Sequence, residues 1–245
     1  MNVIVLPRVD STSTYMRQEL VDAPAGTVVV TDCQSAGRGQ RGNSWEAEPG
    51  ANLTFSVLLR PEGIDASTQY AVSEAVALAI VESLDALVPD AARLAIKWPN
   101  DIYYDDRKIC GILIENTLTG MAVNRSIAGI GININQTRFV SDAPNPVSLS
   151  MLTGETYELR PLLDRVVTRV LDRVAGVATT AGRRDTAADY MARLWRRDGL
   201  HPYMLPDGTR FDAAIECVAP TGHLTLRHAD GTATTHAFKE VAFVI

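Results

Sequence analysis

Short apolar runs alternate along the chain with longer segments whose apolar residues recur at helical spacing. The run over residues 52–60 alternates apolar and polar positions, which predicts a strand with one buried face. Other β-branched or apolar runs predict strands over residues 2–6, 27–31, 93–98, 102–104, 108–115 and 126–134.

Helical spacing predicts four helices. They cover residues 15–20, 67–87, 159–177 and 187–195. The N-cap candidates at 10–13 precede the first helix, Pro89 follows the second, and Pro161 lies near the first turn of the third.

The pattern of the chain changes after Asp198. Short β-rich runs follow, separated by the turn sequences Pro-Asp-Gly at 206–208, Pro-Thr-Gly at 220–222 and Ala-Asp-Gly at 229–231. Such regular turns predict a small β-barrel. We therefore expect one domain over residues 1–197 and a second over 198–245.

Composition narrows the class of protein. Hydrophobic residues make up 46% and charged residues 21% of the 245 positions, which is typical of a globular protein and excludes a disordered or fibrous one. The 23 Lys and Arg against 29 Asp and Glu give a net charge of −6, which argues against a general nucleic-acid binder. If the ligand is an anion, positive charge must be concentrated in one place.

Cysteine usage and the N-terminus predict a soluble cytoplasmic protein. The chain has an odd number of cysteines, Cys33, Cys110 and Cys217, which are widely spaced and form no CxxC pair. This pattern is typical of proteins with reduced thiols. The first residues lack the basic and apolar regions of a signal peptide. The longest apolar stretches are too short to span a membrane.

A loop rich in glycine and arginine is the first candidate for chemistry. Residues 37–42 read Gly-Arg-Gly-Gln-Arg-Gly, but a strand rather than a helix follows, so a dinucleotide-binding loop is excluded by context. Glycines allow close approach of a ligand, and Arg38 and Arg41 suit phosphate or carboxylate. The alternative is a surface turn with two solvated arginines.

Two lysines flank a predicted hairpin. The turn sequence Lys-Trp-Pro-Asn-Asp occupies residues 97–101, and Lys108 follows eleven residues after Lys97. A hairpin of this length can bring both lysines to one end of a sheet. Asn100 or Asp101 would suit Mg²⁺ held together with phosphate. The alternative is an ordinary hairpin with exposed lysines.

Glycines interrupt the last predicted strand of this region. The sequence Gly-Ile-Gly-Ile-Asn at 129–133 is typical of a strand that a ligand approaches closely, and the Asn133 amide could read a base or a ribose hydroxyl. The alternative is a bulged core strand.

Taken in order, these segments resemble one family, the biotin protein ligases (biotin–acetyl-CoA-carboxylase ligases). The matching stretches are 10–13 (Asp-Ser-Thr-Ser), 34–42 with Trp45, 50–53 (Gly-Ala-Asn-Leu), 97–101, 106–108 (Asp-Arg-Lys) with 111–113 (Gly-Ile-Leu), and 129–133. The resemblance implies an α+β fold, in which a mixed sheet with helices forms a class II synthetase-like catalytic domain followed by an SH3-like β-barrel.

The resemblance also implies a two-step reaction. Biotin carboxylate attacks the α-phosphate of Mg-ATP to give biotinyl-5′-AMP and diphosphate, and a lysine of a biotin carboxyl carrier protein then takes the biotinyl group. ATP, biotin and Mg²⁺ are thus expected at the site, with charge neutralisation and positioning as the main contributions of the protein.

Site residues follow from the same resemblance. Ser11, Thr12, Ser13, Gln34 and Gly111 would bind biotin, and Arg38, Gly39 and Gln40 would order over biotin and the adenylate. Lys108 would contact the biotin carboxylate and the reacting phosphate; Lys97, Asn100 and Asp101 would serve ATP, with Asp101 as the Mg²⁺ ligand; Trp45 and Asn133 would contact adenosine. Lys108, Lys97 and Arg38 would be the catalytic residues.

Three positions depart from the family pattern. Ser13 stands where the family usually has asparagine, and Gln40 and Asn43 stand where many members have arginine. Fewer fixed charges over the adenylate would weaken its retention. A lipoate–protein ligase and a non-catalytic biotin-binding sensor are the alternative functions, although the Arg-Arg-x-Ser-Gly-Gly-Gly loop of lipoate ligases is missing from the sequence.

The short segment before Ser11 affects the prediction of binding partners. Only ten residues precede Ser11, which leaves no room for the DNA-binding winged helix of bifunctional members. We therefore expect the monofunctional type, with no binding to DNA or membranes. The sequence leaves open whether the protein forms a homodimer.

Overall fold

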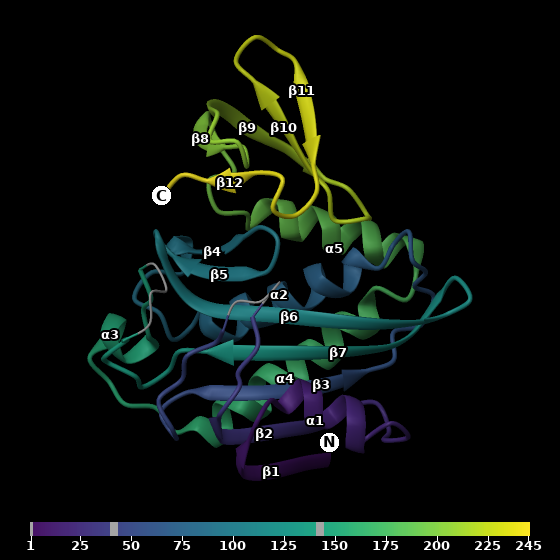
Figure 1. Cartoon of the computed structure of the whole chain (residues 1–245), viewed down its shortest axis with the longest axis vertical. Helices are drawn as coiled ribbons and strands as arrows, with labels where there is room; N and C mark the ends of the chain where they lie inside the picture. Colours follow the sequence, from purple (N-terminus) through teal and green to yellow (C-terminus); the bar gives the residue numbers. More distant parts are fainter. Residues whose placement is uncertain (1, 40–43, 141–144) are drawn as a thin grey trace.

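The computed structural model describes residues 2–39, 44–140 and 145–245. Two β-sheets and several helices make up the described residues (Figure 1). The elements, in chain order, are β1 Asn2–Val9, α1 Thr12–Glu19, β2 Thr27–Gln34, β3 Leu53–Leu59, α2 Tyr70–Leu84, the 3₁₀ turn Ala91–Arg93, β4 Leu94–Lys97, β5 Asp101–Tyr104, β6 Arg107–Thr119, β7 Ala122–Ile132, α3 Leu149–Thr153, α4 Leu159–Gly176, α5 Thr180–Ala192, β8 His201–Met204, β9 Arg210–Val218, β10 Leu224–His228, β11 Ala233–His236 and β12 Ala242–Phe243.

The first sheet has seven strands in the order β1-β2-β3-β7-β6-β5-β4. Its β1–β2 pair is parallel and its other neighbours are antiparallel. The longest pairing joins β6 and β7, where Gly111 lies opposite Gly131 and Leu113 lies opposite Gly129. The predicted strands of the first 135 residues are all present; β6 continues past its predicted end and β7 begins before its predicted start, so the two form one long hairpin.

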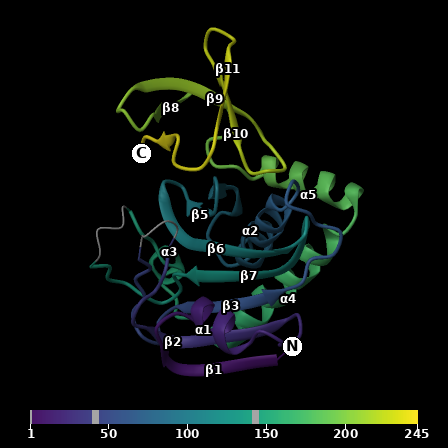
Figure 2. The same ribbon diagram turned by 45° about the vertical axis from the view of Figure 1, so that its right-hand side comes forward.

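Helices cover both faces of this sheet. α2 and α4 pack on one face, with α5 against α2, while α1 lies on the opposite face against β2, β3 and β7 (Figure 2). Ser11 is the N-cap of α1, and its hydroxyl accepts a hydrogen bond from the Thr14 amide. The N-cap candidates at 10–13 therefore do begin a helix.

The prediction of a half-buried β3 was wrong, because both faces of this strand are buried. Phe55 and Val57 belong to the large core under α2 and α4, whereas Leu58 packs with Met16 in a small core under α1. The polar residue Ser56 is fully buried and hydrogen-bonded to α1. An alternating strand looks half-exposed in sequence, but a second helix layer covers its polar face.

Helix boundaries also differ from the expectation. α2 begins at Tyr70, since residues 67 and 68 instead form a turn capped by the Asp65 carboxylate. α5 begins at Thr180, seven residues before the predicted start at 187, with Thr179 as its N-cap. The five-residue helix α3 was not predicted.

The second sheet has the order β11-β10-β9-β8-β12, with antiparallel pairs throughout. It lies above α5 and the β4–β5 end of the first sheet, with the C-terminus pointing toward that end (Figure 1). Its buried residues Tyr203, Leu224 and Leu226 belong to the same continuous core as the first sheet. An antiparallel sheet of this kind agrees with the expected SH3-like barrel.

Candidate active site

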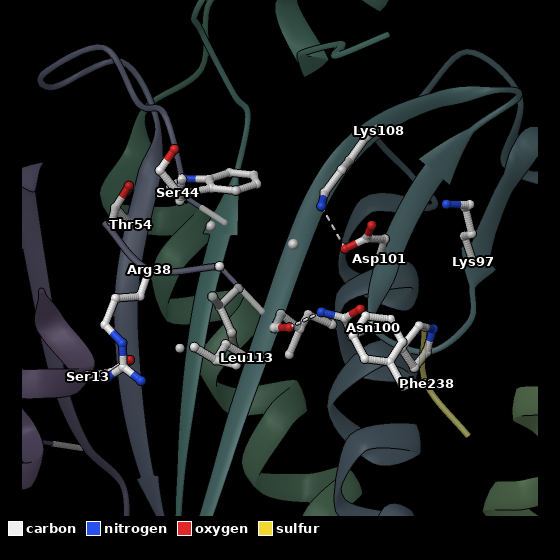
Figure 3. A pocket seen from close by; sticks show the side chains of 18 of the residues that line it. Ser13, Arg38, Ser44, Thr54, Lys97, Asn100, Asp101, Lys108, Leu113 and Phe238 are labelled. Atoms are coloured by element: carbon white, nitrogen blue, oxygen red, sulfur yellow. Dashed lines mark hydrogen bonds and ion pairs between the residues drawn. The ribbon is translucent and has the colours of Figure 1, made fainter. Parts of the chain in front are cut away.

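A cleft of about 1020 Å³ opens on the α1 face of the first sheet and continues to the second sheet. Its floor is β6 and β7, and its walls are the start of α1, the segment after β2, the β4–β5 turn and the last residues of the chain (Figure 3). The cleft therefore gathers side chains that are far apart in sequence.

Hydroxyl and amide groups line one end of the cleft. The Ser56 hydroxyl lies 2.8 Å from the Thr12 hydroxyl and 2.9 Å from the Ser13 hydroxyl. The Gln34 side-chain oxygen accepts from the Thr12 amide at 2.8 Å and from its hydroxyl at 3.2 Å. Ser11 lies at the same end. This part of the cleft suits a neutral ligand with hydrogen-bonding edges.

Glycines form the floor because the Trp45 ring needs their space. A Cβ on Gly131 would lie 2.3 Å from the Trp45 ring, and one on Gly111 would lie 2.9 Å from it. A Cβ on Gly129 would lie 2.5 Å from the Ser13 hydroxyl. The predicted close approach of a ligand to residues 129–133 stays a prediction, since the groups that approach these glycines in this structure are Trp45 and Ser13.

Arg38 lies beside the start of α1 at the edge of the cleft, on the side where Ser13 lies (Figure 3). Its guanidinium forms an ion pair with Glu115 at 2.9 Å and donates to the Thr14 hydroxyl at 3.4 Å. Arg17 pairs with the same Glu115 carboxylate at 3.1 Å. Glu115 thus holds Arg38 beside the cleft.

The other end of the cleft is cationic. The ammonium of Lys108 lies 2.7 Å from the Asp101 carboxylate and 5.7 Å from the centre of the Trp45 ring. Burial is the largest influence on Lys97 and lowers its pKa, while Asp101 opposes that effect. Figure 3 shows the Lys108–Asp101 pair beside Lys97. The hairpin prediction that both lysines reach one end of the sheet is confirmed.

Asn100 has a structural contact within the site. Its amide donates to the Ile112 carbonyl, and the Ile112 amide returns a 3.0 Å hydrogen bond to the Asn100 carbonyl (Figure 3). The peptide bond between Trp98 and Pro99 is cis. Asn100 therefore ties the β4–β5 turn to β6 while lining the cleft.

Most of the predicted site residues come together in this cleft. They are Ser11, Thr12, Ser13, Gln34, Arg38, Gly39, Trp45, Lys97, Asn100, Asp101, Lys108 and Gly111. Gln40 and Asn43, like Arg41, lie outside the described residues. Asn133 is absent from the described lining: it is 3% exposed, and its amide donates to the Val147 carbonyl at 3.1 Å. Its place therefore does not support the predicted adenosine contact.

The sequence analysis missed the contribution of the second sheet. Phe238, Lys239, Val241, Ala242 and Phe243 all line the cleft. A signal for Lys239 was available: the chain has only three lysines, and all three line this cleft. Lys239 also has a left-handed backbone with φ of 72°, which is uncommon for a residue other than glycine.

The described residues also bear on three other features: a metal site, a reactive thiol and a membrane-spanning helix. They contain no group of three or more His, Cys, Asp and Glu side chains placed to hold a metal ion. Burial raises the pKa of the Cys110 thiol, so this cysteine next to Gly111 stays protonated. No helix in the described ranges is both long and apolar enough to cross a membrane.

Comparison with known proteins gives consistent matches. The model of the biotin/lipoate A/B protein ligase family matches residues 5–133. The bifunctional ligase/repressor BirA of Salmonella typhimurium is 39% identical over 205 residues, which are 83% of this chain and 57% of that protein. A biotin–[acetyl-CoA-carboxylase] ligase of Paracoccus denitrificans is 34% identical over 164 residues, which are 65% of this chain and 68% of that enzyme. The chain thus spans little more than half the length of the Salmonella relative.

Solved structures share the fold. The biotin protein ligase of Aquifex aeolicus in complex with biotin and ATP matches 98% of this chain and 97% of its own, with a TM-score of 0.80 and 22% identity. The Leishmania major biotin protein ligase in complex with biotinyl-5-AMP matches 96% of this chain and 98% of its own, with a TM-score of 0.67 and 26% identity. The expected fold class is confirmed, and the chain belongs to the biotin/lipoate A/B protein ligase family.

Proposed function

We propose that this protein is a biotin protein ligase that forms biotinyl-5′-AMP from biotin and Mg-ATP and transfers the biotinyl group to a lysine of a biotin carboxyl carrier protein. One observation carries the proposal: a single cleft joins a hydroxyl- and amide-lined end to a cationic end. The first end suits the neutral biotin ring, and the second suits two anions that must meet.

Charge neutralisation is the main chemical task in the first step. A carboxylate and a polyphosphate repel each other, so attack on the α-phosphate needs cations at the point of approach. Lys108 and Lys97 supply them at the cationic end, and Arg38 supplies a third after exchanging Glu115 for the ligand anion. Diphosphate leaves as the acyl-phosphate bond forms, and AMP leaves when the carrier amine attacks the acyl carbon.

Mg²⁺ would enter with ATP as part of the substrate. In phosphate sites this ion is usually held by one or two carboxylates together with phosphate oxygens and water. Asp101 offers one carboxylate at the cationic end of the cleft, which fits that requirement. Trp45 offers a ring for the nucleotide. The biotin ring contacts are assigned to Ser11, Thr12, Ser13, Gln34 and Gly111.

Two alternatives remain distinct in what they predict. A lipoate–protein ligase would activate lipoate instead of biotin, and a biotin-binding sensor would bind biotin without turnover. The similarity to biotin protein ligases favours biotin, and the cluster of Lys97, Lys108 and Asp101 favours catalysis.

One assay separates the three functions. The protein is incubated with Mg-ATP, labelled biotin or labelled lipoate, and a biotin carrier domain, followed by detection of the adenylate and of label on the carrier. We expect biotin-dependent adenylate and biotinylated carrier. Turnover with lipoate alone, or tight biotin binding without adenylate, would contradict the proposal.

The domain boundaries and the cellular location belong to the same proposal. We assign residues 1–197 to the catalytic domain and 198–245 to the SH3-like domain, with the second sheet as support since all its strands follow residue 198. The cytoplasmic location and the absence of binding to DNA and membranes stay predictions from the sequence.

A further inference from the structure

Three aromatic rings surround the ammonium group of Lys97. Its Nζ lies 4.9 Å from the centre of the Tyr103 ring, 5.4 Å from Phe243 and 6.0 Å from Trp195. All three distances lie within the range at which a cation is attracted to a ring face. The rings come from β5, from the segment after α5 and from β12.

The rings also hold one another. Trp195 lies 5.5 Å from Tyr103 and 5.4 Å from Phe243, between ring centres. Tyr103 and Trp195 are almost fully buried, at 2% and 6% exposure. A cluster that is packed in this way has little freedom, so it fixes where a cation between its rings can sit.

Backbone contacts fasten the cluster to the strand that carries Lys97. The Trp195 amide donates to the carbonyl of Ile96, the neighbour of Lys97, at 2.8 Å. The Arg196 guanidinium stacks on Trp195 at 4.0 Å and donates to the Val244 carbonyl at 2.7 Å. Phe243 pairs with Tyr203 of β8. The last strand of the chain is therefore connected to the cationic end of the cleft.

Apart from these rings, little fixes the position of the Lys97 ammonium. Lysine is flexible, and the carboxylate of Asp101 is already 2.7 Å from Lys108. The described residues show no ion pair for Lys97 within the usual distance, and the three aromatic rings surround its ammonium instead.

We propose that Tyr103, Trp195 and Phe243 form an aromatic cage that positions the Lys97 ammonium for the phosphates of the nucleotide. This proposal rests on the proposed function. In it, Lys97 is a catalytic residue, whereas Trp195 and Phe243 are positioning residues, and Phe243 makes the C-terminal sheet part of the nucleotide site. A role in packing the two sheets together would need the same rings but would not act through Lys97.

The scarcity of lysine permits a direct test of the cage. Protein labelled with [ε-¹³C]lysine contains three labelled side chains, and Lys97→Arg identifies the Lys97 signal by its loss. Ring currents should displace this signal, and Phe243→Leu should shift it toward the position of a solvated lysine. Phe211→Leu is the matched control, because Phe211 stacks on Tyr203 in the same sheet at 5.8 Å between ring centres and is not one of the three rings around Lys97 among the described residues. An unmoved Lys97 signal in Phe243→Leu would overturn the cage, and this result does not depend on turnover.

Kinetics and binding test the positioning role. Phe243→Leu should raise the dissociation constant and KM for Mg-ATP roughly 3- to 10-fold while leaving the KM for biotin unchanged, and Phe243→Tyr should restore the wild-type value. In a Lys97→Gln background, Phe243→Leu should add no further effect on nucleotide binding. An equal effect with and without Lys97, or an equal effect of Phe211→Leu, would assign the rings to packing only.

The experiments distinguish a failure of the proposed function from a failure of the aromatic cage. If the wild-type protein forms no adenylate from biotin, the proposed reaction is wrong, and the titration of the Lys97 signal with Mg-ATP still decides whether the cage serves a nucleotide. Absence of any response of that signal to Mg-ATP would overturn the inference.

Discussion

Lys108 occupies the point where the cationic end of the cleft meets its glycine floor. Its ammonium is paired with Asp101, lies over Trp45, and would be 3.3 Å from a Cβ on Gly111. Lys108 was predictable as a site residue from sequence, because its spacing from Lys97 fits a hairpin and because the surrounding segments resemble those of biotin protein ligases. The pairing with Asp101 depends on the β5–β6 register, which only the fold defines.

Replacing Lys108 should separate catalysis from folding. We expect Lys108→Ala to lower biotin-dependent ATP–diphosphate exchange by roughly 100-fold or more, since a preorganised cation at developing charge has an effect of that size. The free energy of unfolding should change by less than about 1 kcal/mol, because the lost ion pair is partly solvated. Arg107→Ala removes the neighbouring cation, which is not among the described lining residues, and should retain activity. Loss of exchange in both variants would contradict a specific role for Lys108.

Gly131 tests the place of Trp45 in the site. An added Cβ would lie 2.3 Å from the Trp45 ring, so Gly131→Ala must displace that ring. We expect adenylate formation to fall roughly 10-fold or more, as misplaced substrate contacts commonly do, together with a change in tryptophan fluorescence. Gly176→Ala is the control, because a Cβ there meets nothing within 4 Å. Full activity of Gly131→Ala would remove Trp45 from the nucleotide site.

Elements with strong local signals were predictable, and elements that depend on their surroundings were not. The cap of α1 uses a nearby serine and the β4–β5 hairpin uses a five-residue turn sequence, so both depend on residues close together in the sequence. The burial of β3 on both faces depends on α1, and α3 has only five residues, too few for a periodic pattern. The helix α2 was predicted, but its burial almost all round, including that of the 4%-exposed Glu74, depends on the elements packed against it.

Glu74 should make stability depend on pH. Burial raises the pKa of its carboxyl from 4.5 to about 7, so the folded protein holds a proton that the unfolded chain releases above about pH 4.5. Wild-type stability should therefore fall between pH 4.5 and 7 and carry a constant penalty above pH 7. Glu74→Gln does not ionise, so its free energy of unfolding should match wild type near pH 4.5 and exceed it by roughly 1–3 kcal/mol at pH 8.

Urea denaturation at several pH values checks the Glu74 prediction. Glu62→Gln, at an exposed position, provides the comparison for loss of a carboxylate. A stability difference between Glu74→Gln and wild type that stays constant from pH 4.5 to 8 would show that the carboxyl does not titrate in this range in the folded state.

The two sheets meet at the turn that carries the cationic site. Trp98 donates its indole N–H to the Gly222 carbonyl at 3.0 Å, and the Tyr70 hydroxyl donates to the Pro99 carbonyl at 2.8 Å. Gly222 has a φ of 89°, and a Cβ on it would lie 2.7 Å from the Tyr70 ring. The turns at 208 and 222 were both recognisable in sequence, but only the structure distinguishes the one that contacts the catalytic part.

A pair of glycine variants measures this contact. Gly208→Ala and Gly222→Ala change residues with φ of 88° and 89°, but a Cβ on Gly208 meets nothing within 4 Å. Each should lose about 1 kcal/mol of unfolding free energy from its left-handed backbone, and Gly222→Ala should lose a further 1–3 kcal/mol, roughly, from overpacking against Tyr70. Only Gly222→Ala should also reduce adenylate formation. Equal losses in denaturation and activity assays would mean that the contact does not couple the sheets.

The sequence by itself determined the chemical inventory, the local turns and caps, and the family, because these depend on residue types at short spacings. It placed Arg38, Lys97 and Lys108 among the ligand-binding candidates from motifs alone. The tertiary structure decided which side chains share the cleft, since packing brings together residues more than a hundred positions apart. It therefore turned Asn133 away into the protein, added Lys239 from the β11–β12 connection and Phe243 from β12, and surrounded Lys97 with three rings.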